Sequence, residues 1–254
     1  MCSWALNSVI DYYNRSGTPI FGCTMDLSKA FDFVDFCVLF EKLRERQVAP
    51  IFLRTLIYIY SNQYCDVRWN NAFSYRFPIS NGCRQGAISS PLFFNLYVNI
   101  LILKLQSIGI GCKIGNKYCG IMVYCDDIFL LSASRLGLQA MVTTCEKWAT
   151  SHNMKFSTND DVKKSKTKCI IFSKKKSDRL NVAKIILNNM SLPFVDSCKH
   201  LGMNISYDNT FDIDCDMKRC KFVGKVHSLN QELCFASPYV KFKLLNIYCR
   251  SFYG

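Results

Sequence analysis

Two adjacent carboxylates interrupt a long apolar stretch of this chain. Residues 121–131 read Ile-Met-Val-Tyr-Cys-Asp-Asp-Ile-Phe-Leu-Leu, so side chains typical of buried strands flank Asp126 and Asp127 on both sides. The pattern predicts a hairpin with the two carboxylates at its tip. Two like charges in such a setting repel each other and lose hydration unless a cation compensates them. A divalent cation and a plain solvated turn both remain open at this point.

A third carboxylate ends another apolar segment. Residues 21–25 favour a buried strand, and Asp26 follows them directly, where its side chain can face a cleft. Hard oxygen ligands suit Mg²⁺, which usually takes one or two carboxylates together with phosphate oxygens. We therefore expect Asp26 to complete a ligand set with Asp126 and Asp127 if the fold brings the two strand ends together.

Charge and composition narrow the class of partner. The chain has 254 residues, 50% of them hydrophobic, with 32 Lys and Arg against 19 Asp and Glu. The excess of +13 predicts attraction to a polyanion, such as nucleic acid or an anionic membrane face. No apolar run approaches the ~18 residues of a membrane span, so we expect no membrane insertion. Three carboxylates, Mg²⁺ and a basic surface together suggest phosphoryl transfer on nucleic acid.

Fifteen scattered cysteines, an odd number, indicate reduced thiols and an intracellular protein in the nucleus, the cytoplasm or both. Strands and helices alternate along the chain, which predicts an α+β sandwich with one helical layer. Asp35 and Ser90 are the expected N-caps, and Asn70-Asn71 marks a hairpin within residues 63–77. The expected helices span residues 36–46, 51–60, 90–105 and 135–150. The expected strands span residues 21–25, 112–124, 128–133, 168–172 and 183–187.

The carboxylates lie within motifs that resemble those of reverse transcriptases. Residues 124–127 (Tyr-Cys-Asp-Asp) are similar to the Tyr-x-Asp-Asp box, and residues 26–32 (Asp-Leu-Ser-Lys-Ala-Phe-Asp) to the segment that carries the first catalytic aspartate. Residues 82–95 resemble the Gln-Gly…Ser-Pro-x-x-Phe-Asn box. Residues 166–172 resemble the next family motif, and residues 198–202 the turn that contacts the primer. Five boxes in family order are specific, and the chain resembles LINE-type, non-LTR retrotransposon enzymes over roughly its whole length.

The resemblance implies a fold and a reaction. The fold is an α+β right-hand polymerase palm, with a ferredoxin-like sheet and helices on one face. Partial fingers and palm would span residues 1–206, and a partial helical thumb residues 207–254. The function is RNA-directed DNA polymerase, which transfers a nucleotide from a dNTP to the 3′-hydroxyl of a DNA primer on an RNA template. The resemblance leaves the oligomeric state open.

The resemblance also implies roles for individual residues. Asp26, Asp126 and Asp127 would be catalytic and bind two Mg²⁺ ions, for which Mn²⁺ could substitute. Lys166 stays outside this core site, as a solvated or phosphate-contacting lysine, and His200 is expected to be structural. The substrate-binding residues would be Leu27, Phe31 (an aromatic steric gate), Gln85, Gly86 and Tyr124, and the primer grip would be Leu201 and Gly202.

Other interpretations remain open. The chain begins only about 25 residues before Asp26, so we expect a fragment or a decayed copy with reduced or no activity alone. A catalytically silent, nucleic-acid-binding remnant would have the same basic surface. A different palm-fold nucleotidyl transferase, such as a cyclase, would have the same carboxylates, but the motifs at residues 82–95 and 198–202 count against it.

Overall fold

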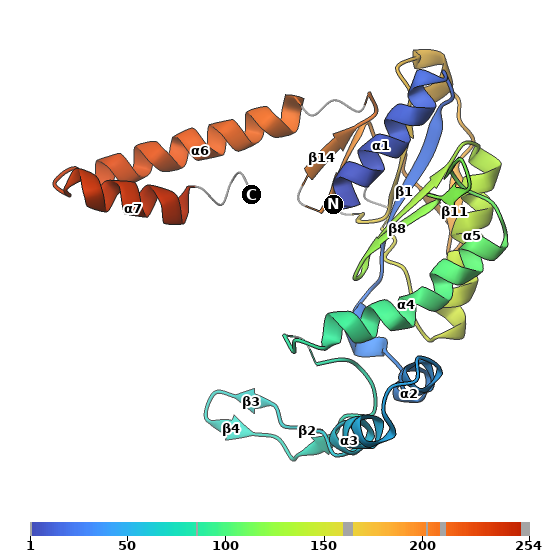
Figure 1. Cartoon of the computed structure of the whole chain (residues 1–254), viewed down its shortest axis with the longest axis vertical. Coiled ribbons are helices and arrows are strands. Elements are labelled where there is room, and N and C mark those ends of the chain that lie inside the picture. Colours follow the sequence, from blue (N-terminus) through green and yellow to red (C-terminus); the bar gives the residue numbers. More distant parts are fainter. Residues whose placement is uncertain (1, 85, 160–164, 202, 209–211, 250–254) are drawn as a thin grey trace.

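A four-stranded antiparallel sheet lies at the centre of the protein (Figure 1). The structure is a computed structural model that describes residues 2–84, 86–159, 165–201, 203–208 and 212–249. The strand order is β10-β1-β9-β8, so the first strand of the chain lies inside the sheet, between two strands that come much later. The bounds of these strands are β1 Ile20–Asp26, β8 Ile121–Tyr124, β9 Asp127–Ser132 and β10 Lys168–Phe172.

Helices α4 (Ser90–Ser107) and α5 (Arg135–Ser151) cover one face of the sheet. Side chains alternate across a strand, so Ile128 and Leu130 of β9 point into this layer, where they belong to the larger core cluster. The apolar side chains that recur at helical spacing along α5 are fully buried, including Trp148. Helices α2 (Phe36–Glu45) and α3 (Pro50–Ser61) extend the layer beyond the sheet.

The opposite face is covered by α1 (Cys2–Arg15), which the sequence patterns did not indicate. Leu6 and Ile10 of α1 pack in a second core cluster with Phe129 and Phe172 from the sheet. The expected α+β class is confirmed, and α1 is an addition to the single helical layer. The uninterrupted apolar sequence of β9 agrees with this arrangement, because a strand that is buried on both faces has no polar alternation.

Local capping explains where several helices begin. The Asp35 carboxylate accepts hydrogen bonds from the N–H groups of Cys37 (2.7 Å) and Val38 (3.2 Å), so the predicted cap of α2 is confirmed. The predicted cap of α4 is wrong by one residue. Ser89 is the N-cap, and the buried hydroxyl of Ser90 instead donates to the Arg84 carbonyl at 2.6 Å, which ties the preceding loop to the helix.

Two parts of the chain project from the sheet and its helices (Figure 1). One is a hairpin around Asn70 and Asn71, as the sequence predicted, in which β2 (Tyr64–Cys65) pairs with β5 (Phe77–Pro78) and β3 (Arg68–Trp69) with β4 (Ala72–Phe73). The other is the helix pair α6 (Asp212–Glu232) and α7 (Pro238–Tyr248). Within the described residues, no helix is long and apolar enough to cross a membrane.

Short elements complete the chain. The expected strand over residues 112–124 is divided, because Gly115 adopts a left-handed turn and only the last residues join the central sheet. The remaining elements are β6 (Lys113–Ile114), β7 (Lys117–Tyr118), β11 (Ile185–Leu187), β12 (Met190–Leu192), β13 (Ser197–His200), β14 (Met203–Ser206) and the 3₁₀ turns η1 (Ala30–Phe33) and η2 (Lys176–Arg179).

Candidate active site

The register of the central strands brings two of the carboxylates together. Asp26, the last residue of β1, is the Cα partner of Asp127, the first residue of β9. Cys125 and Asp126 form the two-residue turn between β8 and β9, so the predicted hairpin tip is confirmed. Cys125 takes a positive φ of 53° at the first turn position, as tight hairpin turns require. The side chains of paired residues on neighbouring strands share one face, and Asp26 and Asp127 therefore face the same space.

Hydrogen bonds hold the Asp26 carboxylate in place. The Ser157 hydroxyl donates to Asp26 Oδ2 at 2.8 Å, and the Ser157 N–H donates to the Asp26 carbonyl at 2.7 Å. The Ser28 and Ser157 hydroxyl oxygens lie 2.8 Å apart, so a second serine supports the first. Sequence reasoning missed Ser157, because 131 residues separate it from Asp26 and it belongs to none of the motifs.

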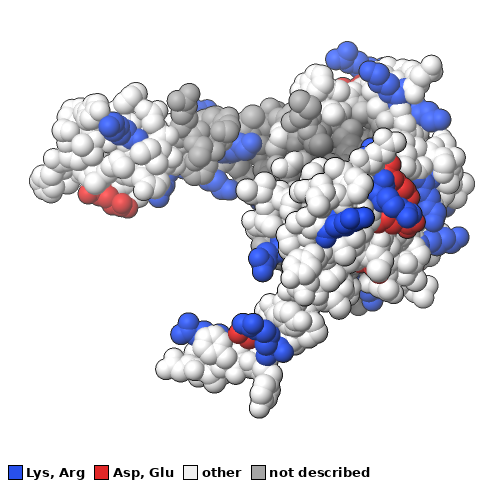
Figure 2. Space-filling view, turned by 60° about the horizontal axis from the view of Figure 1, so that its bottom comes forward, with Lys and Arg blue, Asp and Glu red and all other residues white. Residues whose placement is uncertain are grey.

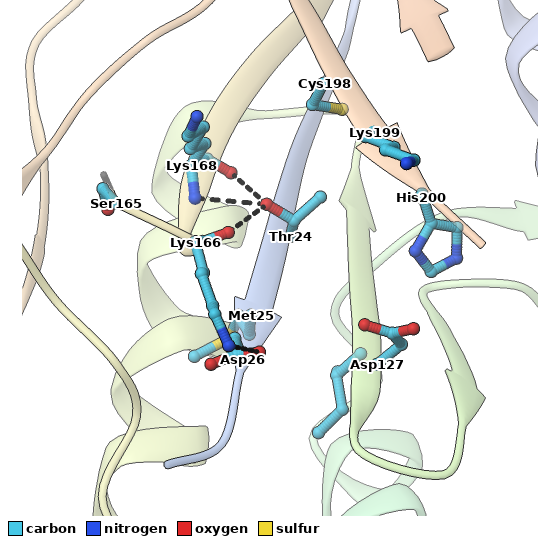
Figure 3. A pocket seen from close by; sticks show the side chains of 11 residues that line it. Thr24, Met25, Asp26, Asp127, Ser165, Lys166, Lys168, Cys198, Lys199 and His200 are labelled. Carbon is cyan, nitrogen blue, oxygen red and sulfur yellow. Dashed lines mark hydrogen bonds and ion pairs between the residues drawn. The ribbon is translucent and has the colours of Figure 1, made fainter. Parts of the chain in front are cut away.

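Lys166 lies at this carboxylate, contrary to its expected position outside the core site. Its Nζ is 3.4 Å from Asp26 Oδ1, and Figure 3 shows the side chain extended along the strand end to reach it. The Thr24 hydroxyl explains this placement. It accepts from the Lys168 N–H (3.2 Å) and donates to the Lys166 carbonyl (3.3 Å), so the backbone before β10 is tied to β1. The lysine-rich composition around Lys166 concealed this specific contact.

Burial and like charge act on the Asp127 carboxylate. Partial burial raises its pKa, as do the neighbouring Asp126 and Asp26 carboxylates, while His200 and Lys166 oppose the shift. His200, from β13, lies across from Asp127 in Figure 3, and its own burial lowers its pKa. His200 lies within residues 198–202, which resemble the primer-contacting turn, but as an isolated histidine at a segment end it was expected to be structural.

The Asp26–Asp127 pair opens into a pocket of about 330 Å³. Lysines outnumber carboxylates along its wall, so the pocket can accept an anion beside the two acids. A second pocket, of about 370 Å³, is lined by Ser28, Ser157 and Lys166, which also surround Asp26. The charged and titratable residues of the first pocket are Asp26, Asp127, Lys166, Lys168, Cys198, Lys199 and His200.

The loop before α4 packs against the segment that follows Asp26. The Gly82 N–H donates to the Val34 carbonyl (2.8 Å), and the Cys83 N–H donates to the Phe31 carbonyl (2.7 Å). A side chain at Gly82 would lie 2.9 Å from the Asp32 carbonyl oxygen, so glycine permits this approach. The half-buried Phe31 ring packs against Phe94 with centroids 4.9 Å apart. Two of the predicted motifs therefore meet here.

The structure describes four of the six remaining predicted site residues. Leu27 is buried and bridged to Phe156, while Gly86 has a φ of 84° and open space where a Cβ would stand. Tyr124 pairs with Asp127, and its side chain is 60% exposed. Leu201 turns the chain between β13 and β14 with a φ of 48°, so the predicted turn is confirmed. Gln85 and Gly202 lie outside the described residues.

The donor set fits a divalent cation that is shared with a ligand. Among the described residues, no group of three or more His, Cys, Asp or Glu side chains is arranged as a ready metal site. Mg²⁺ does not need three side-chain ligands, because it keeps several waters and binds one or two carboxylates plus phosphate oxygens. Asp26 and Asp127 provide such carboxylates, and the pKa of Asp127 is raised first by burial and then by the neighbouring carboxylates, both of which a cation would offset.

Comparisons with known proteins agree in the family they indicate. The profile of the reverse transcriptase (RNA-dependent DNA polymerase) family matches residues 3–205. The chain is 30% identical over 118 residues to the Retrovirus-related Pol polyprotein from type-2 retrotransposable element R2DM of Drosophila melanogaster, which covers 46% of this chain and 11% of that protein. It is 24% identical over 220 residues to the Putative 115 kDa protein in type-1 retrotransposable element R1DM of the same species, covering 84% of this chain and 19% of the relative. The chain thus spans between a tenth and a fifth of the length of these relatives.

Solved structures share the fold at low sequence identity. Telomerase from Candida albicans, in complex with a TWJ fragment of telomeric RNA, superimposes with a TM-score of 0.54 and 12% identity, over 83% of this chain and 32% of that one. Apo telomerase from Candida tropicalis, truncated from its C-terminal domain, gives a TM-score of 0.51 and 11% identity, over 83% and 38% of the two chains. Similarity at this level concerns the fold alone.

Proposed function

This chain belongs to the reverse transcriptase (RNA-dependent DNA polymerase) family, and from that premise we propose that it extends a DNA primer along an RNA template at the Asp26–Asp127 site. It is the reverse transcriptase domain of a protein like those of non-LTR retrotransposons. The observation that carries the proposal is the strand register, which supports joint use of two carboxylates from separate motifs. The bond formed joins the primer 3′-oxygen to the α-phosphorus of a dNTP, and pyrophosphate leaves.

In this proposal the three acidic residues hold divalent cations, with Mg²⁺ as the physiological ion and Mn²⁺ as a substitute. When bound, the ions would lower the pKa of the primer hydroxyl and neutralise charge that develops on the phosphates. Ser157 keeps the Asp26 carboxylate oriented for this task through its 2.8 Å hydrogen bond. Like-charge repulsion between Asp126 and Asp127 makes the cation-bound state favourable.

The basic wall of the pocket would bind the phosphates. Lys166 uses one of its three donors on Asp26 and keeps the others available for phosphate oxygens. Lys168 and Lys199 line the same pocket and attract polyphosphate or primer backbone by their charge. Lysine is suited to this role because it acts as a compact point charge on a flexible stem.

The neighbouring segments would select and orient the substrates. We assign Phe31 as the steric gate against a ribose 2′-hydroxyl, since its ring is fixed by Phe94 beside the first catalytic motif. Leu27 and Gly86 would contact the nucleotide through their backbones, and Tyr124 would lie near the primer end. The turn at Leu201 would support the primer, with Gly202 beside it. Gln85 would lie beside Gly86 in the template and nucleotide contact.

We also propose a division of the chain by role. Residues 1–206 would form the palm with part of the fingers, and residues 207–254 part of a thumb. The separate projection of α6 and α7 from the sheet supports this boundary (Figure 1).

Primer extension tests the proposed function. Purified protein is mixed with an RNA template, an annealed labelled DNA primer, Mg²⁺ and the four dNTPs, and the products are sized. The wild-type protein should lengthen the primer, and Asp126→Ala should abolish extension while template–primer affinity is retained. Glu41→Ala, which removes an exposed carboxylate of α2 outside both pockets at Asp26, is the matched control and should extend normally. Extension that survives Asp126→Ala would contradict the assignment of the site.

A further inference from the structure

A hairpin of exposed aromatic side chains projects from α3. We define residues 62–79 as the aromatic arm; every side chain from residue 64 to residue 78 in it is exposed. Tyr75 is 97% exposed and Trp69 is 78% exposed, although rings of this size are usually buried on at least one face. The exposed rings of the arm are Tyr64, Trp69, Phe73, Tyr75 and Phe77.

These rings contribute nothing to the core of the protein. Residues 62–79 are all described, and none of them belongs to either of the two hydrophobic clusters that hold the sheet and its helices together. Large apolar side chains that remain in water without packing raise the free energy of the free protein, and a contiguous set of them marks an interaction site. The exposed rings are therefore available to a ligand, with Phe73 beside Arg68 on one face of the hairpin and Trp69 beside Ala72 on the other.

The charge of the arm indicates the chemistry of that ligand. Arg68 and Arg76 are exposed on the arm and Arg54 is exposed on the adjoining α3, whereas Asp66 is the one acidic residue among residues 62–79. The Arg68 guanidinium lies 5.7 Å from the centroid of the Phe73 ring, its partner across β3 and β4. Arginine interleaved with exposed rings is the composition of a surface that stacks bases and pairs with phosphates.

The position of the arm agrees with such a ligand. In Figure 1 the arm and the α6–α7 pair project to the same side of the molecule, one below and one above the height of the β8–β9 hairpin. Both projections remain on that side in the turned view of Figure 2. The chain that leaves the arm passes through the loop at Gly82 and Cys83, which is bonded to the backbone around Phe31. The loop at Gly82 and Cys83 therefore connects the arm, which precedes it in sequence, to the segment that carries Phe31.

We propose that the aromatic arm is a stacking platform for single-stranded nucleic acid, occupied by the part of the RNA template that has not yet been copied. This assignment of the strand rests on the proposed function. Aromatic residues and arginine are also enriched at protein interfaces, so the balance of charge decides the assignment: three exposed arginines against one acidic residue favour a polyanion. The arm itself offers Val67 and Ala72 as exposed aliphatic side chains and Ile79 as a half-buried one, and the adjoining α3 also exposes Ile51, Ile57 and Ile59.

Binding measurements with two duplexes test the platform. One is a labelled primer–template with a single-stranded 5′ RNA overhang, and the other is the same duplex with a blunt end, both followed by fluorescence anisotropy with Ca²⁺ and no dNTP. Removing two stacking rings in Trp69→Ala/Tyr75→Ala should weaken binding of the overhang duplex by about tenfold or more. Binding of the blunt duplex should stay within twofold of wild type.

Matched variants separate stacking from general effects. Trp4→Ala removes a tryptophan of α1 that is 74% exposed outside the arm, and it should leave the affinity for both duplexes unchanged. Trp69→Phe/Tyr75→Phe keeps both rings and should retain most of the overhang affinity. Arg68→Gln should reduce the salt dependence of overhang binding, whereas loss of the rings should leave the salt slope in place. Thermal unfolding curves should coincide for all these surface variants.

The possible results distinguish a stacking platform from a protein contact, and both from a failure of the proposed function. Equal affinity of the wild-type protein for the two duplexes, or full overhang affinity in Trp69→Ala/Tyr75→Ala, would overturn the platform. A change of oligomeric state in that variant without a change in overhang affinity would overturn it as well, and would assign the arm to protein contact. Normal overhang binding by a wild-type protein that fails to extend primers would refute the proposed function and leave the platform intact.

Discussion

The contact between Ser157 and Asp26 provides the most specific test of how the site is built. Ser157→Ala removes the hydroxyl that donates to Asp26 Oδ2 at 2.8 Å and leaves the Ser28 hydroxyl without that partner. Hydrogen bonds to a charged group contribute about 1.5–3 kcal/mol. The Asp26 side chain is 20% exposed, so solvent screens the contact moderately and the lower end of that range applies. A loss of ~1.5 kcal/mol corresponds to about a tenfold weaker cation site.

Two assays measure this effect. Mn²⁺ titration of the protein should show about tenfold weaker binding in Ser157→Ala, and primer extension at subsaturating Mg²⁺ should slow by a similar factor. Ser157→Thr retains a hydroxyl and should remain close to wild type. Ser107→Ala removes a hydroxyl that donates within α4 to the Lys104 carbonyl, and should change neither quantity.

A double-mutant cycle isolates the contact. In an Asp26→Asn background the charged acceptor is absent, and Ser157→Ala should therefore cause little further loss of Mn²⁺ affinity. Mn²⁺ binding by Ser157→Ala within twofold of wild type would refute the reasoning, as would a full tenfold loss that persists in the Asp26→Asn background.

Three further predictions concern stability and pH. Gly22→Ala should destabilise the protein by roughly 1–3 kcal/mol in urea unfolding, because a Cβ at Gly22 would lie 2.9 Å from ring atoms of Phe129 and Phe172; wild-type stability would contradict the packing. Asp35→Ala should cost about 1 kcal/mol through loss of the α2 cap, and Asp35→Asn much less, by the same assay. Because the pKa of Asp127 is raised in the folded protein, protonation of this carboxyl stabilises the metal-free fold at pH values below the ordinary carboxyl pKa of 3.8. That contribution is lost as the pH rises through the raised pKa. Thermal unfolding with chelator should therefore give Asp127→Asn a higher Tm than wild type at neutral pH, because it removes a charge that burial and neighbouring carboxylates disfavour, and an equal or lower Tm there would contradict this.

Much of the fold follows from local patterns in the sequence. The apolar period of α5, the proline at the start of α3 and the Asp35 cap each depend on residues within one or two turns, and each predicts its helix. The strand pairing does not follow in the same way, because β1 lies between β9 and β10 and its partners are more than 100 residues away.

The residues of the candidate site likewise divide into those that a local sequence pattern indicates and those that it does not. Asp126 and Asp127 stand out because charges inside an apolar run need an explanation, and the family motifs give Asp26 its role. Ser157 reaches the site only through tertiary packing, and an ordinary polar residue in a loop carries no local signal of it. His200 lies in a family motif, but no local pattern places its side chain beside Asp127. Long-range contacts decide these positions, and no periodicity or spacing reports them.

The position of helix α1 likewise depends on residues far away in the sequence. Its apolar side chains reveal their role only once the second face of the sheet exists for them to cover. A sheet with a polar second face would have left the same segment exposed, so the continuous apolar sequence of β9 was the available signal for a second layer.

Iron-directed cleavage of the chain reports whether Asp26 and Asp127 share one cation site. Fe²⁺ replaces Mg²⁺ in the protein bound to template–primer, and ascorbate with peroxide then generates hydroxyl radicals that cut the backbone near the ion. A shared cation site should give two cuts, one close to residue 26 and one close to residue 127. Mg²⁺ should compete with both cuts, and both should be lost in Asp26→Asn and in Asp127→Asn. Cuts near only one of these strands, or a pattern that either substitution leaves unchanged, would contradict it.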